Sequence, residues 1–139
     1  PGAVHTRFEH SLGVMHLATI MYDSIVNNNK RMLEDHLSYN KIGLEKDRQL
    51  VRLAALLHDI GHAPFSHASE DILPMNPTRN KPYNHEDYTA RIIKNILRDV
   101  IEDHPINKRN CDKEIMIISG EEEGARPLSY FSNIVKKYR

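Results

Sequence analysis

The chain has 139 residues, 40% of them hydrophobic, which predicts one domain with a single buried core. Its 19 basic and 19 acidic side chains cancel, so no whole-chain field would attract nucleic acid or an anionic membrane. The single cysteine excludes an internal disulfide and fits a cytoplasmic protein, and no apolar run approaches the roughly 20 residues of a membrane span.

The first predicted element is a helix from about Glu9 to Asn27, where apolar residues recur at steps of three and four. That face carries Val14, Leu17, Ala18, Met21 and Ile25. His10 lies on the same face, and three asparagines at 27–29 supply a stop. Residues 30–46 are polar and predict a connecting loop, with at most one helical turn around Met32 to Leu37.

A second helix is predicted from about Glu45 to Asp59, with Gly61 closing it. Its apolar side carries Leu50, Leu53, Ala54, Leu57 and His58. Pro64 bars continuation of that helix, and a short new helix is expected to begin with Ser66 as its N-cap. In the turn between them, Phe65 is expected to anchor the chain in the core.

Beyond a loop that contains three prolines, a further helix is predicted from about His85 to Glu102. Its predicted core face carries Tyr88, Ile92, Ile96 and Val100. Shorter helices are expected at Asp112 to Ser119 and at Leu128 to Tyr138. Because strand signals are almost absent, the fold class is predicted to be all-α.

The adjacent pair His58-Asp59 closes the apolar stripe of the second helix, and it carries the first chemical signal. Near a helix end, an imidazole and the neighbouring carboxylate can both turn toward one ion. Such ligands suit Mn, Fe or Zn, or Mg with more oxygen ligands. Taken alone, the dipeptide is better explained by a buried histidine beside an exposed capping aspartate, because such pairs occur by chance.

Two motifs that are separated in the sequence favour the metal-ligand interpretation of His58-Asp59. One is Arg7-Phe8-Glu9-His10-Ser11, and the other runs from His58-Asp59-Ile60-Gly61-His62 to Ala63-Pro64-Phe65-Ser66-His67, with Asn84-His85-Glu86 as a third element. In order and type they resemble the HD superfamily. Within it, the chain is similar to the deoxynucleoside triphosphate triphosphohydrolases, the branch that includes bacterial dGTPases and the SAM- and HD-domain enzyme.

This resemblance implies an HD-domain helical bundle over residues 1–139 and a divalent metal (Mn, Mg, Fe or Zn) as cofactor. It assigns His10, His58 and Asp59 as metal ligands. The family has one more aspartate ligand, shortly after a helix like Leu128 to Tyr138. We therefore expect the sequence to be an HD core from a longer protein, and the resembled enzymes imply a homo-oligomer.

The resemblance also implies hydrolysis of a deoxynucleoside triphosphate to deoxynucleoside and triphosphate, by attack of water on the α-phosphorus. It places His62, His67, Glu70 and His85 among the catalytic and phosphate-facing residues. His67 is the expected general acid, held by Glu70 one helical turn away. Arg7 is expected to bind substrate phosphate, a task that suits a guanidinium.

Two alternatives stay open. One is an HD phosphohydrolase for another nucleotide phosphate ester, and the other is a catalytically silent nucleotide-binding or regulatory HD module. The basic residues between Lys30 and Arg52 alternate with acidic ones, so we expect a solvated surface rather than a nucleic-acid patch. His16, His36 and His104 lie outside the motifs and are interpreted as structural.

Overall fold

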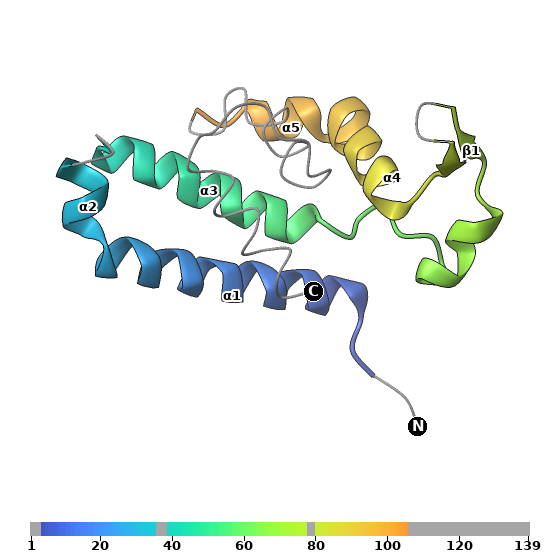
Figure 1. Ribbon diagram of the computed structural model, residues 1–139, viewed down its shortest axis with the longest axis horizontal. Helices are drawn as coiled ribbons and strands as arrows, with labels where there is room; N and C mark the ends of the chain where they lie inside the picture. Colours follow the sequence, from blue (N-terminus) through green and yellow to red (C-terminus); the bar gives the residue numbers. More distant parts are fainter. Residues whose placement is uncertain (1–3, 36–38, 78–79, 106–139) are drawn as a thin grey trace.

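The computed structural model describes residues 4–35, 39–77 and 80–105 of the chain. Figure 1 shows the long helices α1 (Arg7–Asn28) and α3 (Lys41–Leu57) side by side, with the short α2 (Lys30–Asp35) at the end that joins them. A helical run from His85 to Glu102 covers the other side of α3. Among the described residues, no helix is both long and apolar enough to cross a membrane.

Helix α1 begins two residues earlier than predicted, because Thr6 caps it. The Thr6 side chain accepts a hydrogen bond from the Glu9 backbone, and the Glu9 carboxylate accepts from the Thr6 backbone, which together form a capping box. The predicted core face is partly wrong. Leu17 is 54% exposed, whereas Thr19 and Tyr22 are buried, because the contact with α3 lies to one side of the predicted apolar stripe.

The predicted loop over 30–46 is largely wrong, since most of it is helical. Lys30–Asp35 forms α2, and α3 begins at Lys41, four residues before the predicted start. The Asn40 side chain accepts a hydrogen bond from the Gly43 backbone and so caps α3. The polar composition of this segment belongs to the exposed faces of two helix ends rather than to a loop.

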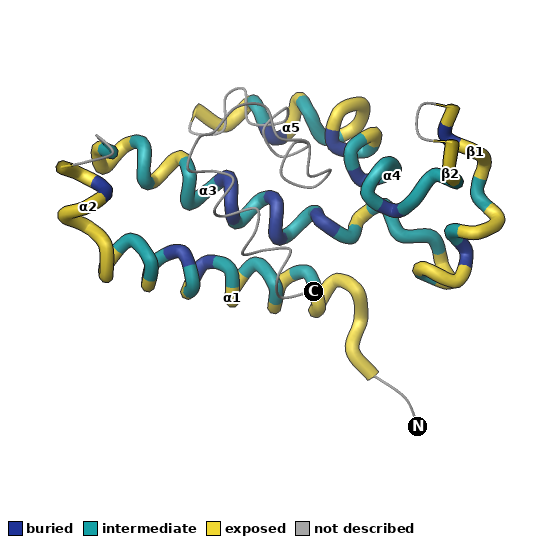
Figure 2. The backbone as a smooth tube through the Cα atoms, in the orientation of Figure 1, coloured by how far each residue is buried: buried dark blue, intermediate teal, exposed yellow. Residues whose placement is uncertain are grey.

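The core lies along α3, which is buried on two sides (Figure 2). Toward the run His85 to Glu102, the buried Ile93 and Ile101 pack with three partly buried leucines, Leu53, Leu57 and Leu97. Leu50 and Ala54, both predicted as core, form a second buried cluster. Val51 and Ala55 are buried as well, whereas the first turns of α3 carry the exposed residues Lys41, Ile42, Glu45 and Lys46.

The segment after α3 turns sharply. The helix ends at Leu57, two residues before the predicted end, and a 3₁₀ helix, η1 (Ser66–Ile72), follows. Ser66 has a φ of 56°, a left-handed conformation rather than the extended one of an N-cap, so its predicted capping role is wrong. Phe65 is 79% exposed, so the predicted core anchor is also wrong: the turn that closes at Ser66 directs this side chain outward.

A two-residue strand β1 (Met75–Asn76) pairs antiparallel with β2 (Lys81–Pro82), a small feature that the sequence did not predict. The last described segment consists of α4 (His85–Ile92), a π-helical turn η2 (Ile93–Leu97) and α5 (Arg98–Glu102).

The predicted core face of this segment is wrong by one residue. Ile96 and Val100 are 69% and 74% exposed, while Ile93 and Ile101 are buried. Apolar residues come in adjacent or nearly adjacent pairs here, so periodicity alone selects neither face. The helices predicted at 112–119 and 128–138 lie outside the described residues.

Candidate metal centre and histidine cluster

The three predicted metal ligands lie together where the start of α1 meets the end of α3. His10 stands in the second turn of α1, His58 is the residue after α3, and Asp59 follows it. Asp59 Oδ1 lies 3.1 Å from His58 Nε2, and Asp59 Oδ2 lies 3.5 Å from His10 Nε2. One donor atom from each residue lies within 4.8 Å of the others, so this trio, the HD trio below, could hold a metal ion.

The hydrogen bond of His58 gives its ring a defined orientation. Its Nδ1 lies 2.8 Å from the carbonyl oxygen of Ala55, which can only accept, so Nδ1 carries the proton. In the neutral ring, Nε2 then directs a lone pair toward the Asp59 carboxylate. Two acceptors so close need a cation between or beside them, either a proton or a metal ion.

Asp59 is ionised in this setting. Burial opposes the charge, but the hydrogen bond and charge that His58 supplies when its Nε2 is also protonated, with smaller contributions from His62 and His85, outweigh it and bring the pKa of Asp59 to about 2. A carboxylate that stays charged while only 17% of its side chain is exposed is a ready cation ligand.

A second group of side chains lies next to the trio and is called the histidine cluster: His62, His67, Glu70 and His85. The parallel rings of His62 and His85 stack at 3.9 Å between centroids, and the edge of His67 meets both rings. Three segments supply these residues, namely the turn after α3, η1 and the start of α4.

Glu70 organises the histidine cluster through a single oxygen. Its Oε1 lies 3.2 Å from His67 Nδ1 and 2.6 Å from His85 Nδ1, and it accepts from the backbone N–H of His85. Burial opposes ionisation of Glu70, but these contacts outweigh it and hold the pKa of the carboxyl below its usual range. The sequence predicted the pairing of Glu70 with His67, one turn away, and missed its bond to His85.

His62 is the most buried imidazole of the cluster, with 4% of its side chain exposed. Burial and then the charge of His85 lower the pKa of His62 to about 4, against the opposing charge of Asp59 and with smaller effects of Arg7 and His67, so its ring is neutral near pH 7. Its Nδ1 is buried without a hydrogen-bond partner. A neutral ring with a free buried nitrogen can accept a proton or bind a cation.

Asp59 connects the two groups, because its Oδ1 lies 3.6 Å from His62 Nε2 as well as close to His58. Arg7, the first residue of α1, is exposed, and its charge reaches His62. All eight residues singled out from the sequence therefore lie at one end of the α1–α3 pair. Their roles in binding and catalysis stay predictions.

Thr89 holds the loop that follows α3 in place through two hydrogen bonds, a role that the sequence did not predict. The fully buried Thr89 hydroxyl accepts from the Gly61 N–H at 3.0 Å and donates to the His58 carbonyl at 3.2 Å. A Cβ on Gly61 would collide with the His85 carbonyl and the Thr89 backbone. Gly61 is therefore needed for close packing against α4, whereas the sequence suggested only a turn.

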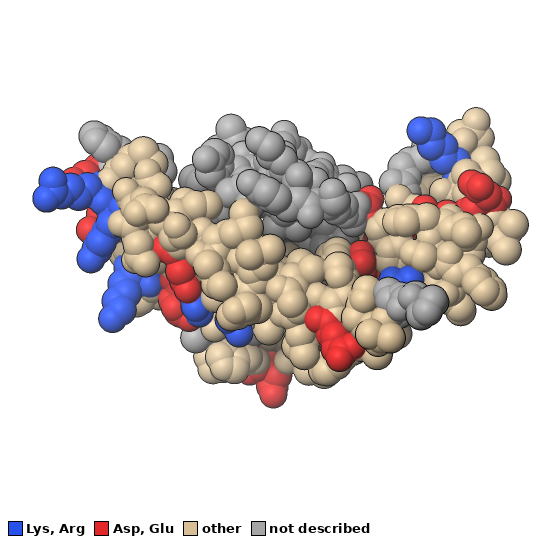
Figure 3. All heavy atoms as spheres, turned by 90° about the horizontal axis from the view of Figure 1, so that it is seen from below, with Lys and Arg blue, Asp and Glu red and all other residues tan. Residues whose placement is uncertain are grey.

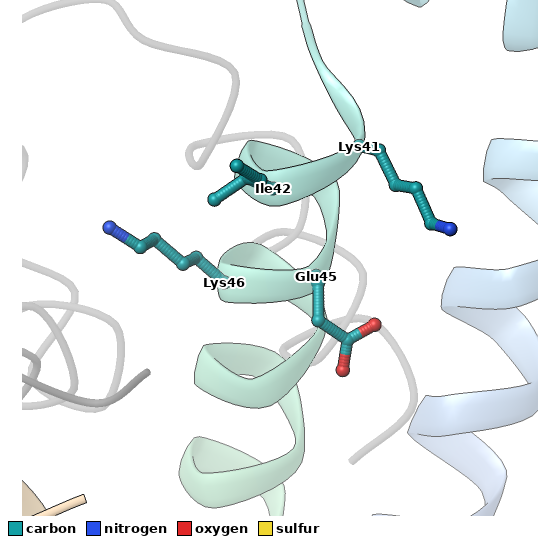
Figure 4. Close-up of a pocket in the computed structure, with 4 residues that line it drawn as sticks. All are labelled: Lys41, Ile42, Glu45 and Lys46. Carbon is teal, nitrogen blue, oxygen red and sulfur yellow. The ribbon is translucent and has the colours of Figure 1, made fainter. Parts of the chain in front are cut away.

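The opposite end of α3 differs in character. A hollow of about 280 Å³ lies there, lined by Lys41, Ile42, Glu45 and Lys46 and without an imidazole (Figure 4). Lys and Arg side chains gather at this end of the molecule, with acidic side chains among them (Figure 3). Arg48 is paired with Asp23 at 2.7 Å, and Arg52 donates to Thr19.

The helical fold and the paired histidine and carboxylate groups define a class of protein. The HD domain family matches residues 7–135, and the chain belongs to this family of phosphohydrolases. The predicted all-α HD fold and the predicted resemblance are thereby confirmed.

Several relatives carry a named activity. The deoxynucleoside triphosphate triphosphohydrolase SAMHD1 homolog of Dictyostelium discoideum is 36% identical over 124 residues, which cover 89% of this chain and 21% of the relative. SAMHD1 of Mus musculus is 33% identical over 97 residues, 70% of this chain and 13% of the relative. The uncharacterized protein YwfO of Bacillus subtilis is 30% identical over 141 residues, which cover 93% of this chain and 28% of the relative. The chain thus spans 21% to 28% of the length of the first relatives it matches.

Proposed function

We propose that this chain is the core of a metal-dependent hydrolase that converts deoxynucleoside triphosphates to deoxynucleoside and triphosphate. The observation that carries the proposal is the position of Asp59, whose Oδ1 faces His58 of the HD trio and His62 of the histidine cluster. The proposed cation site and the proposed proton-transfer site are therefore adjacent. The named activity of the relatives supports this substrate class.

The donor set of the HD trio fits a divalent metal. Two imidazoles and an ionised carboxylate suit Mn, Fe or Zn, and Mg fits if water supplies further oxygen ligands. The free Nε2 lone pair of a neutral His58 and the Asp59 carboxylate face each other, so both can bind the same ion. A divalent ion bound there would supply Lewis acidity toward a phosphoryl group.

The histidine cluster would handle the proton. When water attacks the α-phosphorus, the bond from phosphorus to the deoxyribose oxygen breaks, and that oxygen needs a proton to leave as a hydroxyl. His67 is 69% exposed at its side chain and can meet a substrate, while Glu70 holds its Nδ1. We assign His67 as the general acid and Glu70 as the residue that orients it.

The remaining residues would position the substrate. The neutral His62 and the buried His85 lie beside the trio, where they can contact the attacking water or a phosphate. Arg7 presents an exposed guanidinium near His62, and such a fork suits phosphate oxygens. The net charge of the chain is zero, so the attraction for a triphosphate must come from these local groups.

Several broader predictions belong to the same proposal. Residues 1–139 would form a single HD domain, and the working protein would be a homo-oligomer in the cytoplasm. Its partner would be a nucleotide, without a role for nucleic acid or membrane.

Two other functions differ in measurable ways. A hydrolase for another nucleotide ester would share the metal but release a different product. A silent regulatory module would bind nucleotide without turnover. The complete histidine cluster, with Glu70 bonded to two rings, favours a hydrolase over the silent module, because binding alone does not require a proton donor beside the cation site.

The test begins with the metal content of the purified chain, beside His58→Ala and Asp59→Ala. A triphosphate-release assay follows, with each deoxynucleoside triphosphate and added Mn²⁺. We expect metal in the parent, loss of the HD-trio ion in both variants, and triphosphate only from the parent. His16→Ala, which replaces an exposed histidine of α1 outside both groups, is the matched control and should keep both properties.

Different failures identify different alternatives. Release of monophosphate or pyrophosphate instead of triphosphate would favour another esterase of the same superfamily. Bound metal and bound nucleotide without any product would favour the regulatory module. A folded parent that binds no metal would reject the proposed site altogether.

A further inference from the structure

The histidine cluster has the composition of a metal site in its own right. His62, His67, Glu70 and His85 each offer one donor atom, and the four atoms lie within 4.8 Å of one another. None of the four belongs to the HD trio. Three imidazoles and one carboxylate from three separate segments converge here, whereas an incidental group of surface histidines would be scattered and mobile.

The cluster is already ordered as metal ligands require. Glu70 Oε1 holds His67 at 3.2 Å and His85 at 2.6 Å, so two rings are fixed relative to each other. The His62 ring lies parallel to that of His85, with 7° between their planes, and one ring nitrogen of each lies within 4.8 Å of the other. Ligands that are oriented in advance lose little freedom when an ion binds.

One atom of the cluster lacks a partner. His62 Nδ1 is buried and makes no hydrogen bond, although buried polar atoms are nearly always satisfied. A ring nitrogen in this state either carries an unmatched N–H or presents an unused lone pair. A cation within the cluster would use that lone pair and remove the cost of leaving it unpaired.

We propose that His62, His67, Glu70 and His85 bind a second divalent transition-metal ion, of the Zn²⁺ type, and that this ion inhibits the enzyme. Zn²⁺ prefers four ligands drawn from imidazole nitrogen, thiolate and carboxylate oxygen. Mg²⁺ prefers an octahedron of oxygen atoms and would not favour this nitrogen-rich set. The second site is therefore selective for metals that bind nitrogen well.

The inhibitory role rests on the proposed function, whereas the binding site does not. The proposed general acid His67 cannot donate a proton from a nitrogen that binds a metal ion. His62 and His85 would likewise be unable to contact water or phosphate. A low concentration of Zn²⁺ would thus switch off turnover that Mn²⁺ supports, without removing the ion of the HD trio.

The test counts ions and does not need turnover. The chain is stripped with a chelator and titrated with Zn²⁺, and bound zinc is measured by calorimetry and by elemental analysis. We expect two ions on the parent and one on a double variant, His67→Ala with Glu70→Gln. His67 is largely exposed, so this variant opens no cavity, and circular dichroism checks its fold. Single replacements should weaken the second site about tenfold or more.

Two matched controls separate the sites. His10→Ala removes an HD-trio ligand and should retain the second ion, while His16→Ala, on the same helix, should retain both. One ion on the parent at saturating zinc, or an unchanged second ion on the double variant, would overturn the second site. Full Mn²⁺-supported turnover with both sites occupied by metal would overturn its inhibitory role. Two ions without triphosphate release from any substrate would contradict the proposed function and still support the second site.

Discussion

Gly61 shows how a single residue controls the position of the candidate site. Its N–H is bonded to Thr89, and the backbone of α4 passes so close that no side chain fits between them. Because Thr89 also binds the carbonyl of His58, this contact fixes His58 relative to His85. The separation of the HD trio from the histidine cluster is thus set by backbone packing.

Gly61→Ala should therefore lower the free energy of unfolding by about 1–3 kcal/mol, the usual cost of overpacking. Urea denaturation would measure the change. Gly13→Ala is the matched control, since no atom lies within 4 Å of its would-be Cβ, and in mid-helix it should stabilise the chain by up to about 1 kcal/mol. Equal changes in the free energy of unfolding for the two variants would mean that α4 does not pack closely against Gly61.

At the scale of elements, α1 and α3 are joined by a few polar contacts at their exposed border as well as by packing. Arg48 on α3 makes two hydrogen bonds to the carboxylate of Asp23 on α1. The buried Tyr22 donates its hydroxyl to the Leu44 carbonyl at 2.7 Å, and burial followed by nearby acidic charges raises its pKa. These contacts set the register of two helices that together position the HD trio.

The Asp23–Arg48 pair should make stability depend on pH. The Arg48 hydrogen bond lowers the pKa of Asp23 below its usual 3.8, so the stabilisation is present above that value and is lost as the pH falls through the folded-state pKa. Asp23→Asn should cost at most about 1 kcal/mol at neutral pH, because both side chains are partly exposed. Urea midpoints from pH 7 downward would measure it. Asp35→Asn, an exposed acid at the end of α2, is the control, and a cost for Asp23→Asn that persisted in acid would contradict the assignment.

The run from His85 to Glu102 illustrates the limit of periodicity. Its apolar residues allow two overlapping stripes, and the sequence favoured the one that includes Ile96 and Val100. Packing against Leu53 and Leu57 of α3 selects Ile93 and Ile101 instead, with a π-helical turn between them. The choice depends on α3, which lies far away in sequence.

Replacement of Ile93 and Ile96 would test this choice directly. Ile93→Ala should cost about 2–5 kcal/mol, because a fully buried side chain leaves a cavity. Ile96→Ala should stay within about 0.5 kcal/mol, because that side chain is largely exposed. Chemical denaturation of both variants gives the comparison. A larger loss of stability for Ile96→Ala than for Ile93→Ala would support the core face that the sequence predicted.

For the molecule as a whole, the HD trio links two helices that are separated in the sequence. His10 belongs to α1, while His58 and Asp59 follow α3, so an ion bound by all three would hold these elements together. A ligand that binds only the folded state stabilises it by an amount that grows with the logarithm of its concentration relative to the dissociation constant, about 2.7 kcal/mol at a hundred times that constant.

Mn²⁺ should accordingly raise the melting temperature of the parent and of His16→Ala. It should leave Asp59→Ala nearly unchanged, since that variant lacks the carboxylate. Scanning calorimetry with and without Mn²⁺ would measure the shifts. A rise of the same size in Asp59→Ala would show that the ion binds elsewhere.

Features that depend on neighbouring residues, namely the family motifs and the main helices, can be predicted from the sequence alone. Residue types and spacing in the motifs around His10 and His58 identified the family, and local periodicity identified α1, α3 and the helical run after His85. The residues of the HD trio and of the histidine cluster can be predicted from the sequence, because their members belong to short motifs. The helix caps at Thr6 and Asn40 are also local signals, and they mark the true starts of α1 and α3.

Contacts between residues that are distant in the sequence could not be predicted from local patterns, and they are known from the folded structure alone. His85 stacks on His62 and shares Glu70 with His67, and Thr89 holds the loop at Gly61, because α4 folds back against the turn after α3. The outward position of Phe65 likewise depends on a backbone turn rather than on hydrophobicity. Local patterns specify which chemical groups are present, but contact between distant segments determines which of them meet.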